Sequence, residues 1–163
     1  DLNDASCHCG LEPQSYEKQV QIKIGGIIDS IRLKDNDLSI VDYKTSANEQ
    51  TAKDLETLFD GNNKSRAKYI LQALIYALVL EKDFCSYNIL PILLYLPKMG
   101  NLDDFSEKIK ISVNEISDFR KISDEFSQLL KTKLVEIFDE TTPFKANFDE
   151  NRCQYCEFLN ICS

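Results

Sequence analysis

The strongest helix pattern in the sequence covers residues 64–83, and it constrains the fold most because its body, 69–80, is apolar around nearly the whole circumference of the helix. A basic turn with Lys64, Arg66 and Lys68 opens this helix, and its apolar body covers 69–80. Such a helix is unstable with water on every side, so other elements must pack around it. The basic turn is either a solvated turn or a position that attracts phosphate, as helix N-termini do.

Three stretches are predicted to form strands around this helix, the first of them because it contains β-branched residues. They cover residues 16–33, 38–44 and 88–96, and turn residues at 35–37 join the first two as a hairpin. The Gly25–Gly26 pair predicts a bulge or bend that divides the first stretch. Pro91 indicates an edge position or an irregular start for the third stretch, which is otherwise apolar enough to be buried.

Two further segments complete the predicted order of elements. Residues 45–63 are polar and predict a loop with a short helical piece, closed by the capping residues 61–63. Apolar positions at helical spacing predict a long amphipathic helix over 114–138. The order of three strands, helix, strand and helix favours an α/β (α+β) fold, a mixed central sheet flanked by helices. The length suits a single domain, 1–163, closed by a cysteine-rich segment over 149–163.

The charge of the chain limits the functions that it can serve. A formal net charge of −8 is the wrong sign for a protein whose main task is to grip phosphates. A nucleic-acid role therefore requires metal ions, local basic positions or further domains. Because the chain begins at Asp1 rather than Met, we expect a fragment of a longer protein. With neither a basic-then-apolar leader nor an apolar run of about 20 residues, we expect a cytoplasmic protein without a membrane segment.

The six cysteines favour metal ligation or free thiols over disulfides in an acidic chain of this kind. Those near the two ends are Cys7, Cys9, Cys153, Cys156 and Cys162. His8, the only histidine, lies between the first two, and a metal site there stays open. Cys85 follows the apolar helix and is expected to be a small core residue.

Two acidic side chains and one lysine are predicted to share a face of the hairpin. Side chains alternate along a strand, so Asp42 and Lys44 lie on the same face of the second strand. Asp29 lies on a common face of the preceding strand with Ile27 and Ile31. Burying unpaired carboxylates costs several kcal/mol, so a counter-charge or a metal ion must compensate them.

A divalent cation would compensate both carboxylates and provide a chemistry. Mg²⁺ suits two carboxylates because it prefers oxygen ligands and keeps part of its hydration shell. The ion would bind a phosphate oxygen and lower the pKa of an attacking water. Lys44 would orient or help to deprotonate that water, or offset charge in the transition state. The alternative for Asp42 and Lys44 is a surface ion pair on a hairpin, contributing under about 1 kcal/mol.

The apolar helix carries one strongly polar residue in its body, Gln72, with Tyr76 one turn later on the same face. A buried glutamine needs hydrogen-bond partners. If the side chains of Gln72 and Tyr76 point towards Asp42 and Lys44, these two residues provide the hydrogen-bond partners. The alternative is a glutamine satisfied within the core and a tyrosine that only packs.

Four patterns occur in order along the chain. They are Gly26-x-x-Asp29, Ile40-Val41-Asp42-Tyr43-Lys44-Thr45, Gln72-x-x-x-Tyr76 and Cys153-x2-Cys156-x5-Cys162. Together they resemble the PD-(D/E)XK nuclease superfamily, and within it the RecB- and AddB-type helicase-nucleases, including iron–sulfur-containing members. The resemblance runs from about Glu17 to Cys162.

The resemblance implies a restriction-endonuclease-like core that hydrolyses phosphodiester bonds of DNA with Mg²⁺ or Mn²⁺. Asp29 and Asp42 would bind the metal, with the main-chain carbonyl of Tyr43 as a further ligand. Lys44 would be the catalytic lysine. The Gln72-x-x-x-Tyr76 pair would support the active site and contact DNA.

Two departures from the family pattern bear on these expectations. The family usually has a further metal ligand, histidine or glutamate, on an upstream helix, and the chain begins too late to include it; Glu17 is either a substitute or a surface residue. The three C-terminal cysteines also lack a fourth ligand. The resemblance implies a [4Fe–4S] cluster completed by Cys7, Cys9 or a cysteine of the intact parent, whereas the residues alone leave zinc, a cluster and free thiols open.

We therefore expect a nuclease domain, part of a helicase-nuclease in DNA repair or recombination. Its partners would be DNA and the helicase or other domains of the parent chain or of a partner subunit. The alternative is a catalytically inactive nuclease fold that binds DNA or a partner subunit, which the negative charge favours. A third interpretation is a small interaction domain that is stabilised by a metal bound to the cysteines.

Overall fold

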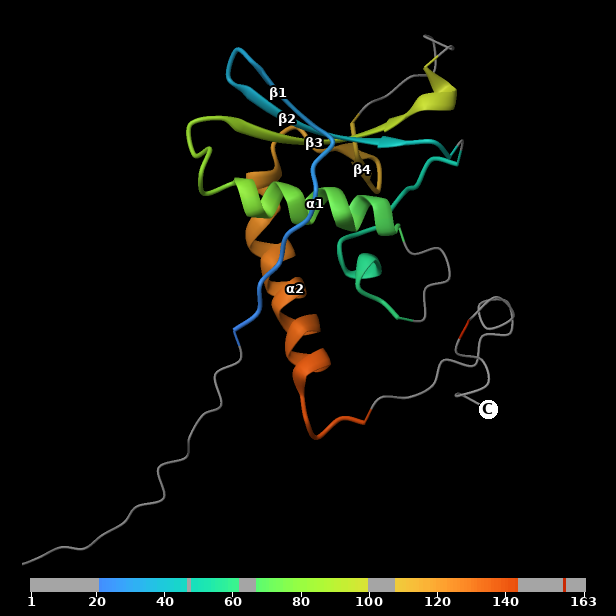
Figure 1. Ribbon diagram of the computed structural model, residues 1–163, viewed down its shortest axis with the longest axis vertical. Helices are drawn as coiled ribbons and strands as arrows, with labels where there is room; N and C mark the ends of the chain where they lie inside the picture. Colours follow the sequence, from blue (N-terminus) through green and yellow to red (C-terminus); the bar gives the residue numbers. More distant parts are fainter. Residues whose placement is uncertain (1–20, 47, 62–66, 100–107, 144–156, 158–163) are drawn as a thin grey trace, which may run out of the picture.

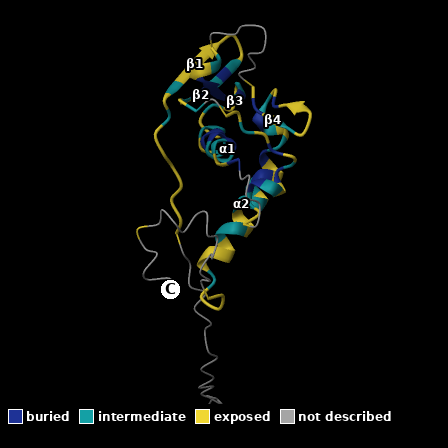
Figure 2. Cartoon of the chain, turned by 90° about the vertical axis from the view of Figure 1, so that its right-hand side faces the viewer, coloured by how far each residue is buried: buried dark blue, intermediate teal, exposed yellow. Residues whose placement is uncertain are grey.

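A three-stranded sheet lies above one helix, and a second helix runs downward from that layer (Figure 1). This computed structural model describes residues 21–46, 48–61, 67–99, 108–143 and 157. Burial is concentrated in the strands at 37–44 and 88–95, the first helix and the start of the second helix, whose far end is exposed (Figure 2). Within the described ranges, no helix has the length and apolar character needed to cross a bilayer.

The sheet is mixed, as expected, with the strand order β1–β2–β3. β1 (Ser30–Lys34) and β2 (Asp37–Lys44) form an antiparallel hairpin, and β3 (Asn88–Tyr95) runs parallel to β2. Since β2 and β3 are parallel, Lys44 and Tyr95 are paired at the C-terminal ends of both strands. These strands and the flanking helices give the mixed α+β architecture expected of a restriction-endonuclease-like core.

Alternation along the strands separates the two faces of the sheet. Ile40 and Leu93 belong to the main core, which includes α1 (Lys68–Leu80), whereas Val41 and Leu94 form part of a separate small cluster. The predicted alternation along β2 is therefore confirmed, with Ile40 and Val41 on opposite faces.

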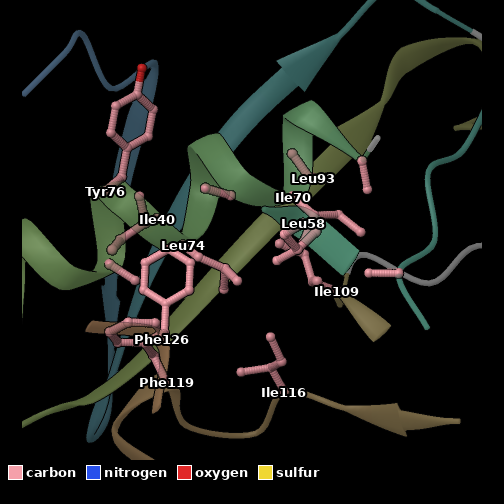
Figure 3. Close-up of a cluster of buried hydrophobic side chains, with 14 of the residues drawn as sticks. Ile40, Leu58, Ile70, Leu74, Tyr76, Leu93, Ile109, Ile116, Phe119 and Phe126 are labelled. Carbon is pink, nitrogen blue, oxygen red and sulfur yellow. The ribbon is translucent and has the colours of Figure 1, made fainter. Parts of the chain in front are cut away.

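The main core lies between the sheet and the helices. α1 contributes Ile70, Ala73, Leu74, Tyr76 and Ala77 to it. Phe119 and Phe126 close the core from below, with ring centroids 5.8 Å apart (Figure 3). The packed helix is confirmed, but packing is not all-round, because Lys68 and Val79 are exposed.

The predicted strand over 16–33 is wrong in its described N-terminal part, because β1 begins only at Ser30. Residues 21–29 form no strand and run past α1, where Ile24 and Gly25 line a groove of about 280 Å³ with residues of the helix (Figure 1). One described strand, rather than two, thus precedes β2. Of its four isoleucines only Ile28 is partly buried against the main core, whereas Ile22, Ile24 and Ile27 are exposed.

The predicted helix over 114–138 is wrong at its N-terminal end, because α2 (Ser123–Phe138) begins later. The preceding residues form β4 (Lys110–Ile111), β5 (Asn114–Glu115) and a 3-10 turn, η4 (Phe119–Lys121). Asp118 explains the change, because its Oδ1 accepts hydrogen bonds from the main-chain N–H groups of Ile89 and Arg120, at 3.1 and 3.2 Å. This side chain ties the turn to the start of β3 and interrupts the helical path.

The remaining expectations are mixed in outcome. The short helical piece in the loop is confirmed as η1 (Glu56–Leu58), and the third stretch forms β3 followed by a 3-10 turn, η2 (Leu96–Lys98). Pro91 lies within β3, at an edge of the described sheet, as a proline in a strand requires. Cys85 is exposed in the turns after α1, so its assignment to the core is wrong. The predicted cap at 61–63 falls largely outside the described residues.

Candidate active site

Asp42 is one of two buried polar residues in the described ranges, with 4% of its surface exposed. Its carboxylate forms an ion pair with the ammonium of Lys44, two residues along the same face of β2. The oxygen in this contact, Oδ2, is buried and accepts no directed hydrogen bond from any described group. The lysine therefore compensates the charge, while the oxygen keeps the capacity for a further ligand.

Lys44 is held by groups from two elements. Besides Asp42, its Nζ donates a hydrogen bond of 3.1 Å to Oε1 of Gln72 on α1. The same Nζ lies 4.2 Å from the centre of the Tyr69 ring, within the range of a cation–π interaction. With only 13% of its side chain exposed, Lys44 is not the solvated surface partner that a simple hairpin ion pair would have.

Gln72 and Tyr76 extend this chain of contacts along α1. Nε2 of Gln72 donates to the Tyr76 hydroxyl at 2.8 Å, so both ends of the glutamine amide have partners. The structure confirms that Gln72 reaches Lys44, whereas Tyr76 is connected to the pair only through Gln72. Tyr76 is buried and points its hydroxyl away from the aromatic core (Figure 3).

Asp29 joins the group from the residue before β1. The pairing of Ser30 with Val41 places Asp29 next to Asp42 across the hairpin. Oδ2 of Asp29 accepts a hydrogen bond of 2.9 Å from the main-chain N–H of Tyr43. Because the N–H and C=O of a strand residue point to the same neighbouring strand, the Tyr43 carbonyl also faces the side of Asp29.

The donor set fits a hydrated hard cation better than a metal enclosed by protein ligands. No group of three or more His, Cys, Asp or Glu side chains that could hold a metal occurs in the part of the chain described. Two carboxylates and one carbonyl are nevertheless the number of protein ligands with which Mg²⁺ keeps several waters. The buried oxygen of Asp42 fits such an ion, which would share it with Lys44.

Several candidate residues lie outside the described residues. They are Cys7, His8, Cys9, Glu17, Lys64, Arg66, Cys153, Cys156 and Cys162. From the basic turn only Lys68 is described, exposed at the start of α1 with its Nζ 5.2 Å from the centre of the Tyr69 ring. The cysteine-based predictions therefore stay predictions.

Sequence reasoning missed three residues near the site. Tyr69 lies one turn before Gln72, and this helical spacing was a signal that could have found it. Gln50 and Tyr95 gave no such signal, because their connection to the site is purely tertiary. Oε1 of Gln50 accepts from the N–H of Tyr69 at 2.8 Å, and the N–H of Gln50 donates to the Tyr95 hydroxyl at 3.0 Å. Burial raises the pKa of Tyr95, which keeps this phenol protonated at neutral pH.

A family model described as the PD-(D/E)XK nuclease superfamily matches residues 3–163. The match includes every residue of the contact chain from Asp29 to Tyr76. Searches of curated proteins and of solved structures found no match to this chain.

Proposed function

The chain belongs to the PD-(D/E)XK nuclease superfamily, and on that basis we propose that it hydrolyses phosphodiester bonds of DNA at Asp29, Asp42 and Lys44. Members of this superfamily are nucleases that generally use divalent metals, and we propose Mg²⁺ or Mn²⁺ here. The observation that carries the proposal is the buried Asp42–Lys44 pair, linked to α1 through Gln72. A buried pair of this kind contributes little net stability, so a chemical role is a reason for the chain to bury it.

Asp29, Asp42 and the carbonyl of Tyr43 would bind the cation. When bound, the cation would neutralise charge on the scissile phosphate and make a water molecule more acidic. The hydrolysis forms a bond from the water oxygen to phosphorus and breaks one P–O ester bond; one proton of the water ends on the leaving oxygen as a hydroxyl group, and the other is released from the phosphomonoester. The hydrogen bond from the N–H of Tyr43 keeps Asp29 beside this carbonyl before any ligand arrives.

Lys44 would stabilise the negative charge that grows on the phosphate oxygens during attack. Its ammonium is fixed in place by Asp42 and Gln72, so little reorganisation is needed as the charge develops. Gln72 and Tyr76 would act as the support of the lysine, and Tyr76 would also contact the nucleic acid.

The wider context is a proposal that rests on the sequence motifs. We propose that residues 1–163 form one domain of a helicase-nuclease that acts in DNA repair or recombination. Cys153, Cys156 and Cys162 would bind a [4Fe–4S] cluster with a fourth cysteine in the intact parent protein. The helicase or other domains of that parent, or a partner subunit, would then supply the positive charge that this chain lacks.

Calorimetric titration with Mn²⁺ and DNA cleavage assays together test the site. Asp29→Ala and Asp42→Asn should lose both Mn²⁺ binding and cleavage, because each removes a ligand. Lys44→Ala should lower kcat by about 100-fold or more. The same variant should bind Mn²⁺ at least as tightly as the wild type, because a competing cation on Asp42 is gone.

Lys34→Ala and Asp37→Ala serve as matched controls at the other end of the same hairpin, and both should cleave normally. Unchanged cleavage in both Asp42→Asn and Lys44→Ala would refute the assigned roles. Mn²⁺ binding without cleavage in the wild type would instead favour an inactive nuclease fold that binds DNA or a partner, the function that the net charge of −8 suggests.

A further inference from the structure

We propose that Tyr69 and Gln50 are positioning residues for Lys44: the ring sets the place of the ammonium, and Gln50 sets the place of the ring. The inference rests on the proposed function in one respect, namely that Lys44 acts in cleavage. Neither residue belongs to the four sequence motifs that contain Asp29, Asp42, Lys44, Gln72 and Tyr76.

The Tyr69 ring is a third contact of the Lys44 ammonium, besides the carboxylate of Asp42 and the amide oxygen of Gln72. Asp42 and Gln72 contact Nζ through oxygen atoms, and the ring centre lies 4.2 Å from the same nitrogen. The π-face of an aromatic ring attracts a cation without accepting a directed hydrogen bond. Tyr69 therefore restricts where the ammonium lies without using a donor that the phosphate would need.

Gln50 fixes the ring through the backbone of the helix. The first N–H groups of a helix have no partner within it, and the N-cap residue of α1, Ala67, provides no side-chain cap. Oε1 of Gln50 accepts from the N–H of Tyr69 at 2.8 Å and so supplies that cap from a distant loop. The hydrogen bond is made to the residue whose ring contacts Lys44, so loss of this cap would displace the ring.

Tyr95 connects this cap to the sheet. Its buried hydroxyl accepts a hydrogen bond of 3.0 Å from the N–H of Gln50. Tyr95 is also the residue of β3 paired with Lys44 of β2. The contacts therefore form a ring of four residues. Lys44 is paired with Tyr95, Tyr95 is bonded to Gln50, Gln50 is bonded to Tyr69, and the Tyr69 ring contacts the Lys44 ammonium.

Two pairs of variants separate positioning from mere packing. Tyr69→Phe keeps the ring and Tyr69→Leu removes it; Gln50→Glu keeps the hydrogen-bond acceptor and Gln50→Ala removes it. We expect Tyr69→Leu and Gln50→Ala to lower kcat by about 10- to 100-fold with little change in KM, because they misplace a group of the reaction. Tyr69→Phe and Gln50→Glu should stay close to the wild type.

NMR of the full chain without cation or DNA provides a readout independent of cleavage. The ε-methylene protons of Lys44 should be shifted upfield by the Tyr69 ring in the wild type and in Tyr69→Phe. That shift should disappear in Tyr69→Leu and shrink in Gln50→Ala. Tyr87→Leu is the matched control, because Tyr87 packs on Phe84 before the start of β3, at the opposite end of the strand from Tyr95.

The outcomes distinguish the two proposals. A wild type that never cleaves, with the expected Lys44 shifts, refutes the nuclease function but supports the positioning. An unchanged Lys44 shift in Tyr69→Leu, or equal loss of kcat in Tyr69→Leu and Tyr69→Phe, overturns the positioning. If Tyr69→Leu does not fold, Gln50→Glu against Gln50→Ala decides: equal Lys44 shifts in these two variants overturn the inference.

Discussion

Single residues in the candidate site are constrained by close approach as much as by charge. A Cβ added to Gly26 would lie 2.7 Å from Cε1 and 2.9 Å from the hydroxyl oxygen of Tyr76. Gly26 has no positive φ, so its backbone would accept alanine, and only the tyrosine ring excludes a side chain. The absence of a side chain at Gly26 thus leaves space for the Tyr76 ring, whose hydroxyl accepts a hydrogen bond from Gln72.

Gly26→Ala is therefore expected to destabilise the fold by about 1–3 kcal/mol, as overpacking of a well-packed site does. Gly25→Ala, with nothing within 4 Å of the added Cβ, should change stability by no more than about 0.5 kcal/mol. Urea denaturation of both variants measures the difference. Equal stability of the two would contradict the close packing of Tyr76 against this segment.

Among the elements, the junction between β3 and η4 depends on one side chain. The carboxylate of Asp118 accepts from Ile89 at the start of β3 and from Arg120 in the turn. Arg120 adds a second link by donating from its guanidinium to the carbonyl oxygen of Phe84 at 2.9 Å. These contacts place Phe119 in the core and direct α2 away from the sheet.

Asp118→Ala should lower the free energy of unfolding by about 1–2 kcal/mol, because it leaves two main-chain donors without their acceptor. Asp118→Asn keeps an acceptor oxygen and should lose less. Thermal or urea unfolding followed by circular dichroism measures both variants. A loss that is equal in the two would show that the negative charge, not the hydrogen bonds, matters at this junction.

The C-terminal end of α2 carries a pH-dependent contact. Hydrogen bonds from the Thr141 and Thr142 hydroxyls and from the Thr141 N–H lower the pKa of Asp139. A lowered pKa in the folded state contributes stability above the unfolded pKa of about 3.9, and this contribution is lost as the pH falls through the folded value. Asp139→Ala should thus be less stable than the wild type at neutral pH, and urea titrations should show the difference vanishing in acid. A constant difference down to the lowest pH would contradict this.

For the molecule as a whole, the net charge of −8 opposes binding to a polyphosphate. The described basic groups near the site are partly engaged, since Lys44 pairs with Asp42 and Lys98 with Glu49. Attraction to a phosphate at this end of the sheet should therefore depend on the cation rather than on the protein's own field.

Binding of a labelled DNA oligonucleotide to Lys44→Ala, which should cleave it at least about 100-fold more slowly than the wild type, tests this dependence. Fluorescence anisotropy should show weak binding in a chelator and at least about tenfold tighter binding with Mn²⁺, or about 1.4 kcal/mol. Asp42→Asn should show no gain with Mn²⁺. Equal affinity with and without the cation would mean that basic side chains dominate the interaction.

Local patterns were sufficient for much of the fold and for the main residues of the site. The alternation that groups Asp42 with Lys44, and the helical spacing that groups Gln72 with Tyr76, involve neighbours only a few residues apart. The hairpin, the buried helix and β3 follow from the same short-range rules. The pattern failed over 21–29, where Ile22, Ile24 and Ile27 are exposed and form no strand. It also failed over 114–122, where Ile116 and Phe119 are buried by contact with distant elements instead of within an α-helix.

Long-range pairing decided the rest. Lys44 meets Gln72 because β2 and β3 are parallel and α1 crosses their face, and no local pattern encodes that register. The same pairing brings Tyr95 beside Lys44 and, through Gln50, to the first turn of α1. These contacts depend on loop closure and side-chain packing across the whole domain, so only the tertiary structure could show that a loop glutamine caps the helix whose tyrosine contacts the lysine.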